Sequence, residues 1–553
     1  MKTHLLSGFK AFEAIRTGME DFAKTAERSL GPCGRSTLIE HVGKLVPNVV
    51  KDGITLARSL EYREREKNVG LRILVRAARD LDEEFSDGVC TLVVVLASLL
   101  REIARATASG IPIDPILEGL RNGAEETSAL LQTWMRPVEE SDLPRLLPSA
   151  VAGESNLVGL VCKAFDKVGV DGNVSAEIGN RFEDEVEIIA AARYDRGFLS
   201  SAFLTDREAL LVDLENPLLL LTDLVLDDFE ALVPALNLAA ERKRAIAIIA
   251  AGFAENVRTA LIINHLRGRV RCTAGLAPAF GDTRSDFVGD LAAVTGGRAF
   301  LEARGDALRS IQFSDFGECE RLKMTEDTTE IVGGRGSEET KKRRAEQIRA
   351  QLAFESSRSK SFMTHMGLRE SAEDRIGLLQ GLRAELRVGG VDDVARKYRL
   401  TFAKKAVGVS QSLLRGGAVP GAGAAFTAAA LHLQELADRS SDLGFCSGLQ
   451  AMAAGLLAPR VAIFRNRGVR APQEAALALD RKNPWIAREL KGDRPIDLWQ
   501  AGIADPHGLA ARIVEVAASN AKLLCRTGAV IVRRDEEIDF SDEEAAATRE
   551  AMR

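Results

Sequence analysis

The stretch Phe85-Ser86-Asp87-Gly88-Val89-Cys90-Thr91 contains the residue types of a turn that binds phosphate and metal. The carboxylate of Asp87 is the hard oxygen ligand that Mg²⁺ prefers, and Gly88 allows a phosphate to approach the backbone. The apolar residues that follow recur at helical spacing, so we expect a helix to open here, with N–H groups that attract an anion. Of the three residues after Gly88, only Thr91 carries a hydroxyl. The stretch therefore predicts a phosphate and metal site in which some donors have been replaced.

Composition excludes some classes of function. Hydrophobic residues make up 46% and charged residues 28% of the 553 positions, the balance of a globular protein with roughly three or four domains. The formal net charge is −6 and aromatic residues make up only 5%. A nucleic-acid binder is expected to have a basic excess and aromatic side chains for base stacking. We therefore expect no nucleic-acid partner.

The cysteines and the N-terminus indicate a reducing compartment. The seven cysteines are scattered, without the paired spacing of a disulfide framework or a zinc site. The first residues lack an apolar signal segment, and no stretch approaches the run of about 20 uninterrupted apolar residues that spans a membrane. We expect a cytoplasmic protein with no membrane partner.

Helical periodicity covers both ends of the chain, and a different pattern fills the middle. Up to about residue 134 the apolar spacing is helical, with one short strand-like run at 36–39. From about 190 to 330, β-rich runs alternate with helical segments. Helices return from about 416 and are followed by a strand at 528–533 and an acidic tail. This order indicates a mainly helical domain built from both termini, with other domains inserted into it.

Short motifs, most of them containing glycine, recur along the chain. The first three are Leu30-Gly31-Pro32, Lys51-Asp52-Gly53 and Asp87-Gly88. The others are Tyr194-Asp195-Arg196-Gly197-Phe198, Phe280-Gly281-Asp282, Thr295-Gly296-Gly297, Asp327-Thr328-Thr329 and Gly421-Ala422-Gly423. Each motif alone is common in turns. In this order and spacing, the set resembles the group I, GroEL-type chaperonins over nearly the whole chain.

The resemblance implies a multidomain chaperonin fold. A mainly α equatorial domain would comprise residues 1–134 and 416–553, the latter ending in the acidic tail. A small α+β intermediate domain would comprise 135–189 and 383–415, and an α/β apical domain 190–382. Members of the family use ATP and Mg²⁺, assemble into seven-membered rings that enclose non-native polypeptides, and can take a co-chaperonin lid. These cofactors and partners are what the resemblance implies for this chain.

By the same resemblance, the nucleotide would contact residues from several segments. The implied contacts are Leu30, Gly31, Pro32, Lys51, Asp87, Gly88, Thr91, Gly421, Ala422 and Asp505. Asp87 would hold Mg²⁺, and Asp52 would orient the metal or the attacking water. Two departures weaken this site: Cys33 replaces a family lysine, and Ala422 adds a methyl group where the family has glycine.

The family's catalytic aspartate falls on Lys405 when the residues are counted back from Gly421. An aspartate there would position or deprotonate the water that attacks the γ-phosphate. An ammonium group can do neither unless its pKa is strongly lowered. We therefore expect a weakened or lost ATPase, and we hypothesise that Lys405 supplies the positive charge that a metal ion otherwise brings to Asp52 and Asp87. The alternative is that Lys404 and Lys405 both point to solvent.

Chaperonins of this group capture clients on apolar side chains of the apical domain. The matching positions here are Phe198, Phe203, Val233, Leu236, Ile262 and Ile263. The alternative is that these side chains pack their own domain, which is the commoner role of apolar stripes. Arg258, at a family leucine position, places a charge beside them.

The sequence is interpreted as a divergent group I chaperonin paralogue that binds non-native polypeptides in a homo-oligomeric ring, with chaperonin-type ATPase ancestry and an altered catalytic site. Two alternatives remain open. One is a conventional ATP-dependent folding chaperonin whose site tolerates the changes. The other is a chaperonin-derived structural scaffold without folding activity.

Overall fold

The chain forms two compact units in a computed structural model, residues 1–158 with 404–553 and residues 159–403. The structure describes residues 2–40, 48–50, 53–149, 151, 155–169, 173–179, 181–189, 191–207, 209–279, 282–358, 372, 375–490, 492 and 494–534. Two helices, α7 (Ser155–Val168) and α13 (Asp393–Gly416), begin in one unit and end in the other.

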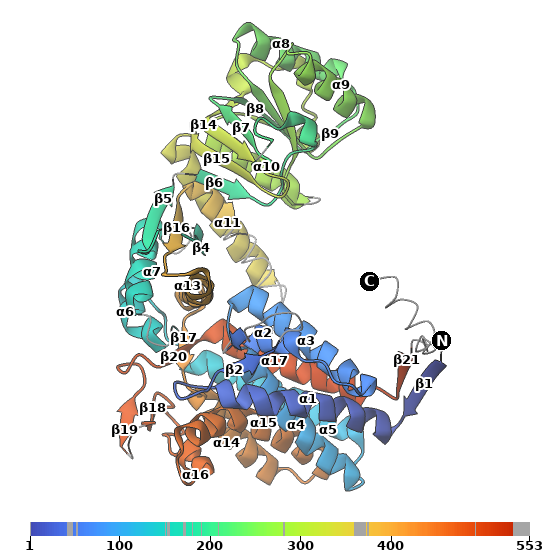
Figure 1. Ribbon diagram of the computed structural model, residues 1–553, viewed down its shortest axis with the longest axis vertical. Helices are drawn as coiled ribbons and strands as arrows, with labels where there is room; N and C mark the ends of the chain where they lie inside the picture. The colour runs from blue at the N-terminus through green and yellow to red at the C-terminus, as the bar shows by residue number, and fades with distance from the viewer. Residues whose placement is uncertain are drawn as a thin grey trace, which may run out of the picture. The chain divides into compact units, whose positions relative to one another are not determined.

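The first unit consists mainly of long helices from both ends of the chain, which lie side by side (Figure 1). Its helices are α1 (Phe9–Ser29), α2 (Gly53–Ser59), α3 (Arg65–Phe85), α4 (Val89–Ala108), α5 (Ile113–Trp134), α6 (Leu143–Leu146), α14 (Ala424–Arg439), α15 (Leu443–Arg467), α16 (Pro472–Leu477) and α17 (His507–Cys525). The first half of α4 is apolar on every side, as expected for a helix at the centre of a domain. It packs against α1, α15 and α17. α15 is long and apolar enough to cross a membrane, but it is largely buried among α4, α5 and α14, as in a core helix.

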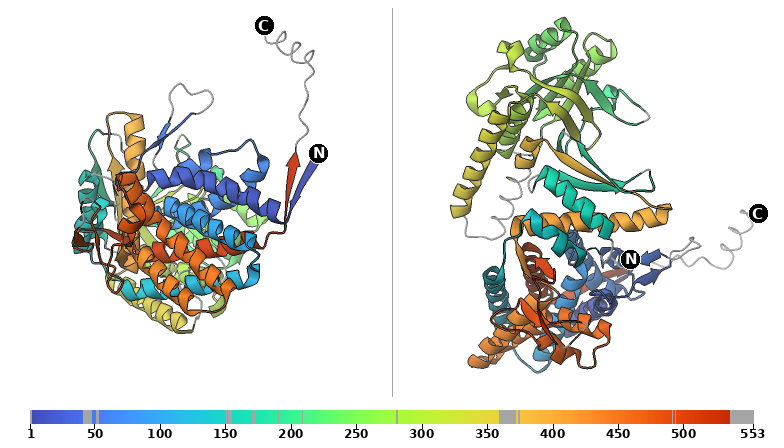
Figure 2. Two further views of the ribbon diagram at one scale, coloured as in Figure 1. Left: turned by 90° about the horizontal axis from the view of Figure 1, so that it is seen from below. Right: turned by 90° about the vertical axis from the view of Figure 1, so that its left-hand side faces the viewer.

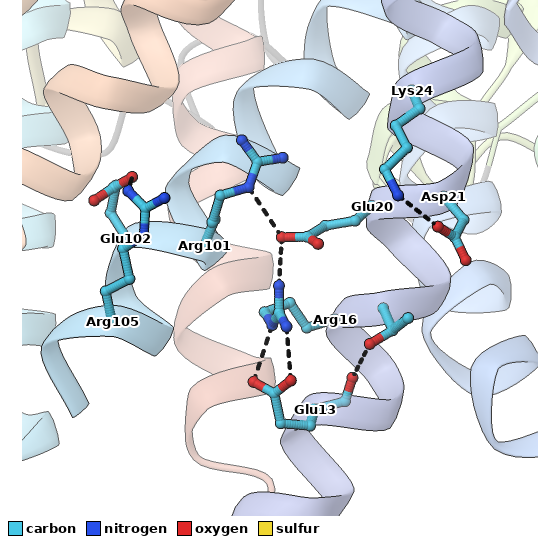
Figure 3. A network of polar contacts seen from close by, with 9 residues as sticks. Glu13, Arg16, Glu20, Asp21, Lys24, Arg101, Glu102 and Arg105 are labelled. Carbon is cyan, nitrogen blue, oxygen red and sulfur yellow. Dashed lines mark hydrogen bonds and ion pairs between the residues drawn. The ribbon is translucent and has the colours of Figure 1, made fainter. Parts of the chain in front are cut away.

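A polar network joins α1 to α4 (Figure 3). The Glu20 carboxylate accepts hydrogen bonds from Arg16 Nη1 at 2.5 Å and from Arg101 Nε at 3.1 Å. Arg16 also binds both carboxylate oxygens of Glu13, one turn earlier in α1. The side chain of Glu20 is only 14% exposed, so the network links the two helices at a partly desolvated position, where such a pair is worth more than at the surface.

Short strands pair in this unit as four two-stranded ribbons. They are β1 (Lys2–Ser7) with β21 (Ala529–Arg534), β2 (Thr37–Ile39) with β3 (Asn48–Val50), β17 (Ala418–Pro420) with β20 (Ala504–Pro506), and β18 (Ile486–Arg488) with β19 (Pro495–Asp497). The β1–β21 ribbon pairs the two ends of the described chain and lies at one edge of the unit (Figure 2). The β17–β20 ribbon is buried and brings residues about 85 positions apart in the sequence into register.

The second unit is built around an eight-stranded mixed sheet with the order β12-β10-β8-β14-β15-β6, to which β13 and β7 are added. Its strands are β6 (Ala191–Tyr194), β7 (Val212–Glu215), β8 (Leu218–Thr222), β10 (Ile246–Ala250), β12 (Cys272–Leu276), β13 (Ala299–Phe300), β14 (Gly317–Met324) and β15 (Thr329–Gly334). β8 and β10 are buried at every residue, as parallel strands covered on both faces are. A separate parallel pair consists of β9 (Val225–Leu226) and β11 (Gly252–Phe253). In the sequence, β9 follows β8 and β11 follows β10.

Helices of this unit connect the strands. α8 (Val233–Glu241), α9 (Glu255–Leu266) and α10 (Asp282–Thr295) follow one another between the parallel strands, and α11 (Glu338–Arg358) follows β15. Asp290 of α10 is fully buried and accepts hydrogen bonds from Arg344 and Arg375, each at 2.6 Å. A separate three-stranded sheet consists of β4 (Asn173–Ile178), β16 (Arg383–Val388) and β5 (Glu185–Ile189).

The structure differs in detail from the sequence-based expectations. The strand-like run at 36–39 is β2, but β1 and β3 also lie in the region that was expected to be helical. Both are short polar-apolar strands whose pairing partner is set by the fold rather than by local spacing. The helix α8 begins only at Val233, because a 3₁₀ turn at Glu230–Leu232 precedes it. The predicted division into three domains stays a prediction.

Candidate functional site

Asp87 lies at the tip of a tight turn between α3 and α4. The residues on either side of it adopt the left-handed conformation, with φ of 55° at Ser86 and 84° at Gly88. Ser86 ends α3 by donating its N–H to the carbonyl of Asp82 at 2.8 Å. The φ of Gly88 favours glycine, and a Cβ atom at this position would lie 2.6 Å from Leu509 Cδ1, so the Leu509 side chain would have to move. The turn therefore holds the Asp87 carboxylate at the start of α4.

Lys405 of α13 forms an ion pair with Asp87. Its Nζ lies 2.9 Å from Asp87 Oδ1, and both side chains are about one third exposed, at 32% and 33%. The neighbouring Lys404 is exposed. The two lysines therefore do not share an environment: Lys404 faces solvent, whereas Lys405 contacts the carboxylate expected to hold Mg²⁺. Asp52, the other carboxylate in that hypothesis, lies outside the described residues.

A glycine in α13 allows this contact. Gly408, one turn after Lys405, packs directly on the α3–α4 turn: a Cβ atom there would lie 2.9 Å from Ser86 Cβ and 3.1 Å from the carbonyl oxygen of Phe85. Any larger residue would push α13 away from the turn. The sequence-based reading missed Gly408, although a glycine in the middle of a helix is itself a sign of close backbone packing.

Asp505 joins the same group of charges. It lies on β20, opposite Val419 of β17. The Gly421-Ala422-Gly423 loop follows β17 directly in the sequence. The pKa of Asp505 is raised to about 7, mainly because the carboxylate is buried and also because of the negative charge of Asp87, while Lys405 opposes the increase. Asp505, Asp87 and Lys405 therefore interact electrostatically. At neutral pH their charges nearly balance, because the Lys405–Asp87 pair is neutral and Asp505 is part-protonated.

The loop after β17 is held close to β20 and α15. A Cβ atom at Gly421 would lie 2.8 Å from the nitrogen of Ala504, so this glycine is required by packing. Ala422 has a φ of 53°, a conformation that costs an alanine roughly 1 kcal/mol. Its carbonyl accepts a hydrogen bond at 3.2 Å from Arg460, a buried α15 residue that also donates to the carbonyls of Ala476 and Arg488. Burial lowers the pKa of Arg460 to about 10. The sequence-based reading missed this residue, since an arginine inside an apolar helix gives no sign of which carbonyls it binds.

The Leu30-Gly31-Pro32 loop is docked against the same helix. Asn466 of α15 donates to the carbonyls of Glu27 and Leu30, at 2.7 and 2.9 Å. Gly31 has a φ of 78°, and a Cβ atom there would lie 3.0 Å from Ile463. The loop therefore keeps the geometry of a backbone turn whose N–H groups can face an anion.

The start of α4 is where three segments meet. Ser29 Oγ lies 3.2 Å from Cys90 Sγ, which places the end of α1 against the first turn of α4. A Cβ atom at Gly53, the first residue of α2, would lie 2.7 Å from the same sulfur atom. Thr91 follows in this turn and is half-buried. The structure thus brings together Leu30, Gly31, Pro32, Asp87, Gly88 and Thr91, with Gly421, Ala422 and Asp505 in the same unit. Lys51 lies outside the described residues.

The residues present do not fit a Mg²⁺ ion at Asp87. Asp87 Oδ1, one of the two carboxylate oxygens available to a metal, already accepts the Lys405 ammonium at 2.9 Å. Within the described ranges, no group of three or more His, Cys, Asp or Glu side chains is arranged to hold a metal ion. A divalent cation and an ammonium at this position would repel each other strongly at such a distance. One oxygen of the Asp87 carboxylate is therefore paired with a cation of the chain itself, and Lys405 offers no carboxylate with which to activate water.

Comparison with known proteins identifies the family. Residues 22–231 and 230–535 match the model of the TCP-1/cpn60 chaperonin family. The chain belongs to this chaperonin family. Its sequence is 34% identical to Chaperonin GroEL 3 of Methylococcus capsulatus, over 98% of both chains. It is 28% identical to Chaperonin CPN60-like 1, mitochondrial, of Arabidopsis thaliana, over 95% of this chain and 88% of that protein.

Solved structures confirm the chaperonin fold over nearly the full length. The chaperonin gp146 from bacteriophage EL, crystallised in the presence of ATP-BeFx, superposes with TM-scores of 0.75 and 0.78 in two crystal forms. Each match covers 96% of this chain and 99% of gp146, at 18% and 17% identity. The multidomain chaperonin fold expected from the sequence motifs is therefore confirmed.

The residues matching the client-binding positions of a chaperonin differ in exposure. Val233 of α8 and Ile263 of α9 are exposed, at 37% and 40%. Phe198 and Ile262 are partly buried against the core of the second unit. Phe203 and Leu236 do not reach the surface, at 0% and 5% exposure, because they fill the space between the helices and the sheet. Phe203 and Leu236 therefore belong to the core of this unit and support the exposed residues above them.

Proposed function

We propose that this chaperonin binds non-native polypeptides as a self-assembled ring, and that its nucleotide site no longer supports ordinary ATP hydrolysis. The observation that carries the proposal is the 2.9 Å ion pair between Lys405 and Asp87. It places a cation where the reaction needs a carboxylate that activates water, and it engages one oxygen of the carboxylate expected to bind the metal.

Exposed apolar side chains of the second unit support client binding. Val225, Leu210 and Leu266 are exposed at 64%, 62% and 64%, in addition to Val233 and Ile263. Large apolar residues that are exposed to solvent are candidates for an interaction surface. Because such contacts are non-directional, they suit partners that expose apolar segments of varied sequence.

The residues of the nucleotide site favour loss of ATP hydrolysis more strongly than loss of nucleotide binding. The glycines that let a phosphate approach the backbone remain at positions 31 and 88, both with positive φ. What has changed is the group that would deprotonate or orient water. We therefore expect the chain to retain weak affinity for a nucleoside phosphate and to turn it over very slowly.

Client binding is tested by suppression of aggregation. The full-length protein is mixed with a chemically denatured client, with and without ATP, and light scattering is followed. We expect suppression that does not depend on ATP and no later release of folded client. Val233→Ser combined with Ile263→Ser should abolish suppression and leave the melting temperature unchanged, whereas Lys342→Ser, an exposed substitution on α11, should leave suppression intact.

The same assay separates the alternatives. ATP-dependent release of active client would favour the conventional folding chaperonin. Ordered assembly without capture of any denatured protein would favour the structural scaffold.

A further inference from the structure

The C-terminal ends of α8 and α9 carry an unusual concentration of positive charge. Arg242, Lys243 and Arg244 follow α8, and Arg267, Arg269 and Arg271 follow α9. We call Arg242, Lys243, Arg267, Arg269 and Arg271 the basic end. All five are exposed. The chain as a whole is acidic, with a formal net charge of −6, so this local excess runs against its composition.

Topology brings the two basic turns together. β8, β10 and β12 are adjacent parallel strands, and α8 and α9 connect them in succession, so the two helices lie on one face of the sheet and run in the same direction. The two helices lie next to each other in Figure 1. The N–H of Ile246 donates to the carbonyl of Arg271 at 2.9 Å, which places the residues entering β10 and β12 side by side. The six cations therefore lie at the end of the sheet where β10 and β12 begin.

The cations of the basic end form no ion pair with a carboxylate among the residues that the structure describes. Arg244 is paired, with Glu318 at 3.0 Å, and is therefore not part of the basic end. Arg242 lies over the ring of Phe313, with its guanidinium 4.3 Å from the centroid. For Lys243, Arg267, Arg269 and Arg271, no ion pair with a carboxylate occurs among the residues that the structure describes.

The opposite ends of the helices are different. Asp228, before α8, forms an ion pair with Arg309 at 2.8 Å, and this contact lowers the pKa of Asp228. Glu255, at the start of α9, lies 3.7 Å from Arg258. Negative charge at the N-terminal ends is thus partly neutralised within the chain, whereas positive charge at the C-terminal ends is left for another partner. Cations also stabilise helix C-termini through the helix dipole, but that effect does not require five of them at one edge.

Exposed apolar residues lie within the same region. Leu266 is 64% exposed and directly precedes Arg267, and Ile263 is 40% exposed one turn earlier. A partner that covers these two side chains must lie beside Arg267 and Arg269. Charge complementarity then decides which apolar segments are accepted, because like charges brought together at a contact disfavour it and opposite charges speed its formation.

We infer that this surface selects acidic amphipathic polypeptide segments, whose apolar face covers Ile263 and Leu266 while their carboxylates pair with the basic end. The inference rests on the proposed client-binding function and names the class of client. A segment of the same apolar pattern with basic residues is rejected. The selectivity is electrostatic and exposed to solvent, so it weakens as salt is added.

Three labelled peptides test the inference against the full-length protein. All have leucine at one helical stripe, and their remaining positions are glutamate, glutamine or lysine. Fluorescence anisotropy at low and high salt gives each affinity. We expect the glutamate peptide to bind about tenfold more tightly than the lysine peptide at low salt, with the difference reduced at high salt. Arg267→Glu combined with Arg269→Glu should abolish or invert the preference and leave the glutamine peptide unaffected.

A matched variant controls for net charge. Lys342→Glu combined with Arg343→Glu changes two exposed cations of α11 by the same amount and should leave the preference unchanged. Equal binding of the glutamate and lysine peptides, or a preference that survives in the Arg267/Arg269 variant, would overturn the inference. If a denatured protein and all three peptides fail to bind, the client-binding function itself fails. A purely structural role for the basic end would instead lower the melting temperature of its variant without altering selectivity.

Discussion

Lys405 illustrates how one side chain can take over an electrostatic role while removing a chemical one. The pKa of Asp505 is raised mainly because the carboxylate is buried, and repulsion from the negative charge of Asp87 contributes to the increase. In a metal-binding site, a divalent cation would relieve this repulsion. Here the Lys405 ammonium does so, which stabilises the site, but an ammonium cannot activate water as a carboxylate would.

Asp505 should make the stability of the protein depend on pH. Its pKa is about 7 in the folded chain and near 4 when unfolded, so the folded state binds the extra proton between these values. Stability from this group is fully present below pH 4 and is lost as pH rises towards and through 7. Melting temperatures of the wild type and of Asp505→Asn should therefore be similar at pH 5, and the variant should be the more stable at pH 8. An equal difference at both pH values would contradict this assignment.

Ala422 should tolerate replacement by glycine unusually well. Its φ of 53° strains an alanine by roughly 1 kcal/mol, which offsets the ~0.5–1 kcal/mol that glycine costs in backbone entropy. We expect Ala422→Gly to change the free energy of unfolding by less than about 0.5 kcal/mol. Ala424→Gly, two residues later at the start of α14, should destabilise by ~1 kcal/mol. Chemical denaturation of both variants checks the comparison, and equal losses would show that position 422 is not strained.

At the scale of secondary-structure elements, the site depends on how closely α13 packs against the α3–α4 turn. Lys405 reaches Asp87 because Gly408 brings the helix backbone within contact distance of Ser86. The turn itself is rigid, since left-handed residues flank Asp87 and both are held by hydrogen bonds or packing. The ion pair is therefore a consequence of helix docking as well as of the lysine side chain.

Gly408→Ala should show the importance of this docking. Alanine favours the helix by ~1 kcal/mol, but its methyl group would overlap Ser86, and overpacking of this kind costs ~1–3 kcal/mol. We expect net destabilisation of up to about 2 kcal/mol. Gly159 is a matched control, because it also lies in a helix, α7, but has no atom within 4 Å of the added Cβ position. Gly159→Ala should stabilise by about 0.5–1 kcal/mol, and a loss of the same size in both variants would argue against close packing at Gly408.

At the scale of the whole molecule, two ribbons of the first unit present unpaired edges. Leu5 and Ile531 lie directly opposite each other in the β1–β21 ribbon and are exposed at 61% and 66%, and Leu38 of β2 is exposed at 67%. Isolated two-stranded ribbons are only marginally stable in water. Exposed apolar pairs on such ribbons indicate contact with another copy of the chain.

Charge on the β1–β21 ribbon should therefore disrupt assembly. Leu5→Lys combined with Ile531→Lys removes the apolar pair and adds repulsion, and we expect mass photometry to show a shift from ring to single subunits. Leu210→Lys, at an equally exposed leucine of the second unit (62%), should leave the assembly intact. Rings that persist in the double variant would exclude this ribbon from the subunit contact.

The sequence was sufficient for the family and the fold, because these depend on motifs whose order spans the chain. It was insufficient for contacts that depend on three-dimensional packing. Gly408, Asn466 and Arg460 carry no motif, yet they position α13 and the two loops of the site. Phe203 and Leu236 matched client-binding positions but are buried. The sequence could not show this, because an apolar residue can face either the core or the solvent.

The most direct test of the account is the rate of ATP hydrolysis by the wild type, Lys405→Asp and Lys404→Asp, measured on assembled protein with Mg²⁺ present. The account predicts negligible turnover for the wild type and for the Lys404 variant, whose side chain faces solvent, and a gain of at least about tenfold for Lys405→Asp, since a positioned general base contributes 10²–10⁴-fold. Brisk wild-type hydrolysis that Lys405→Asp leaves unchanged would contradict it.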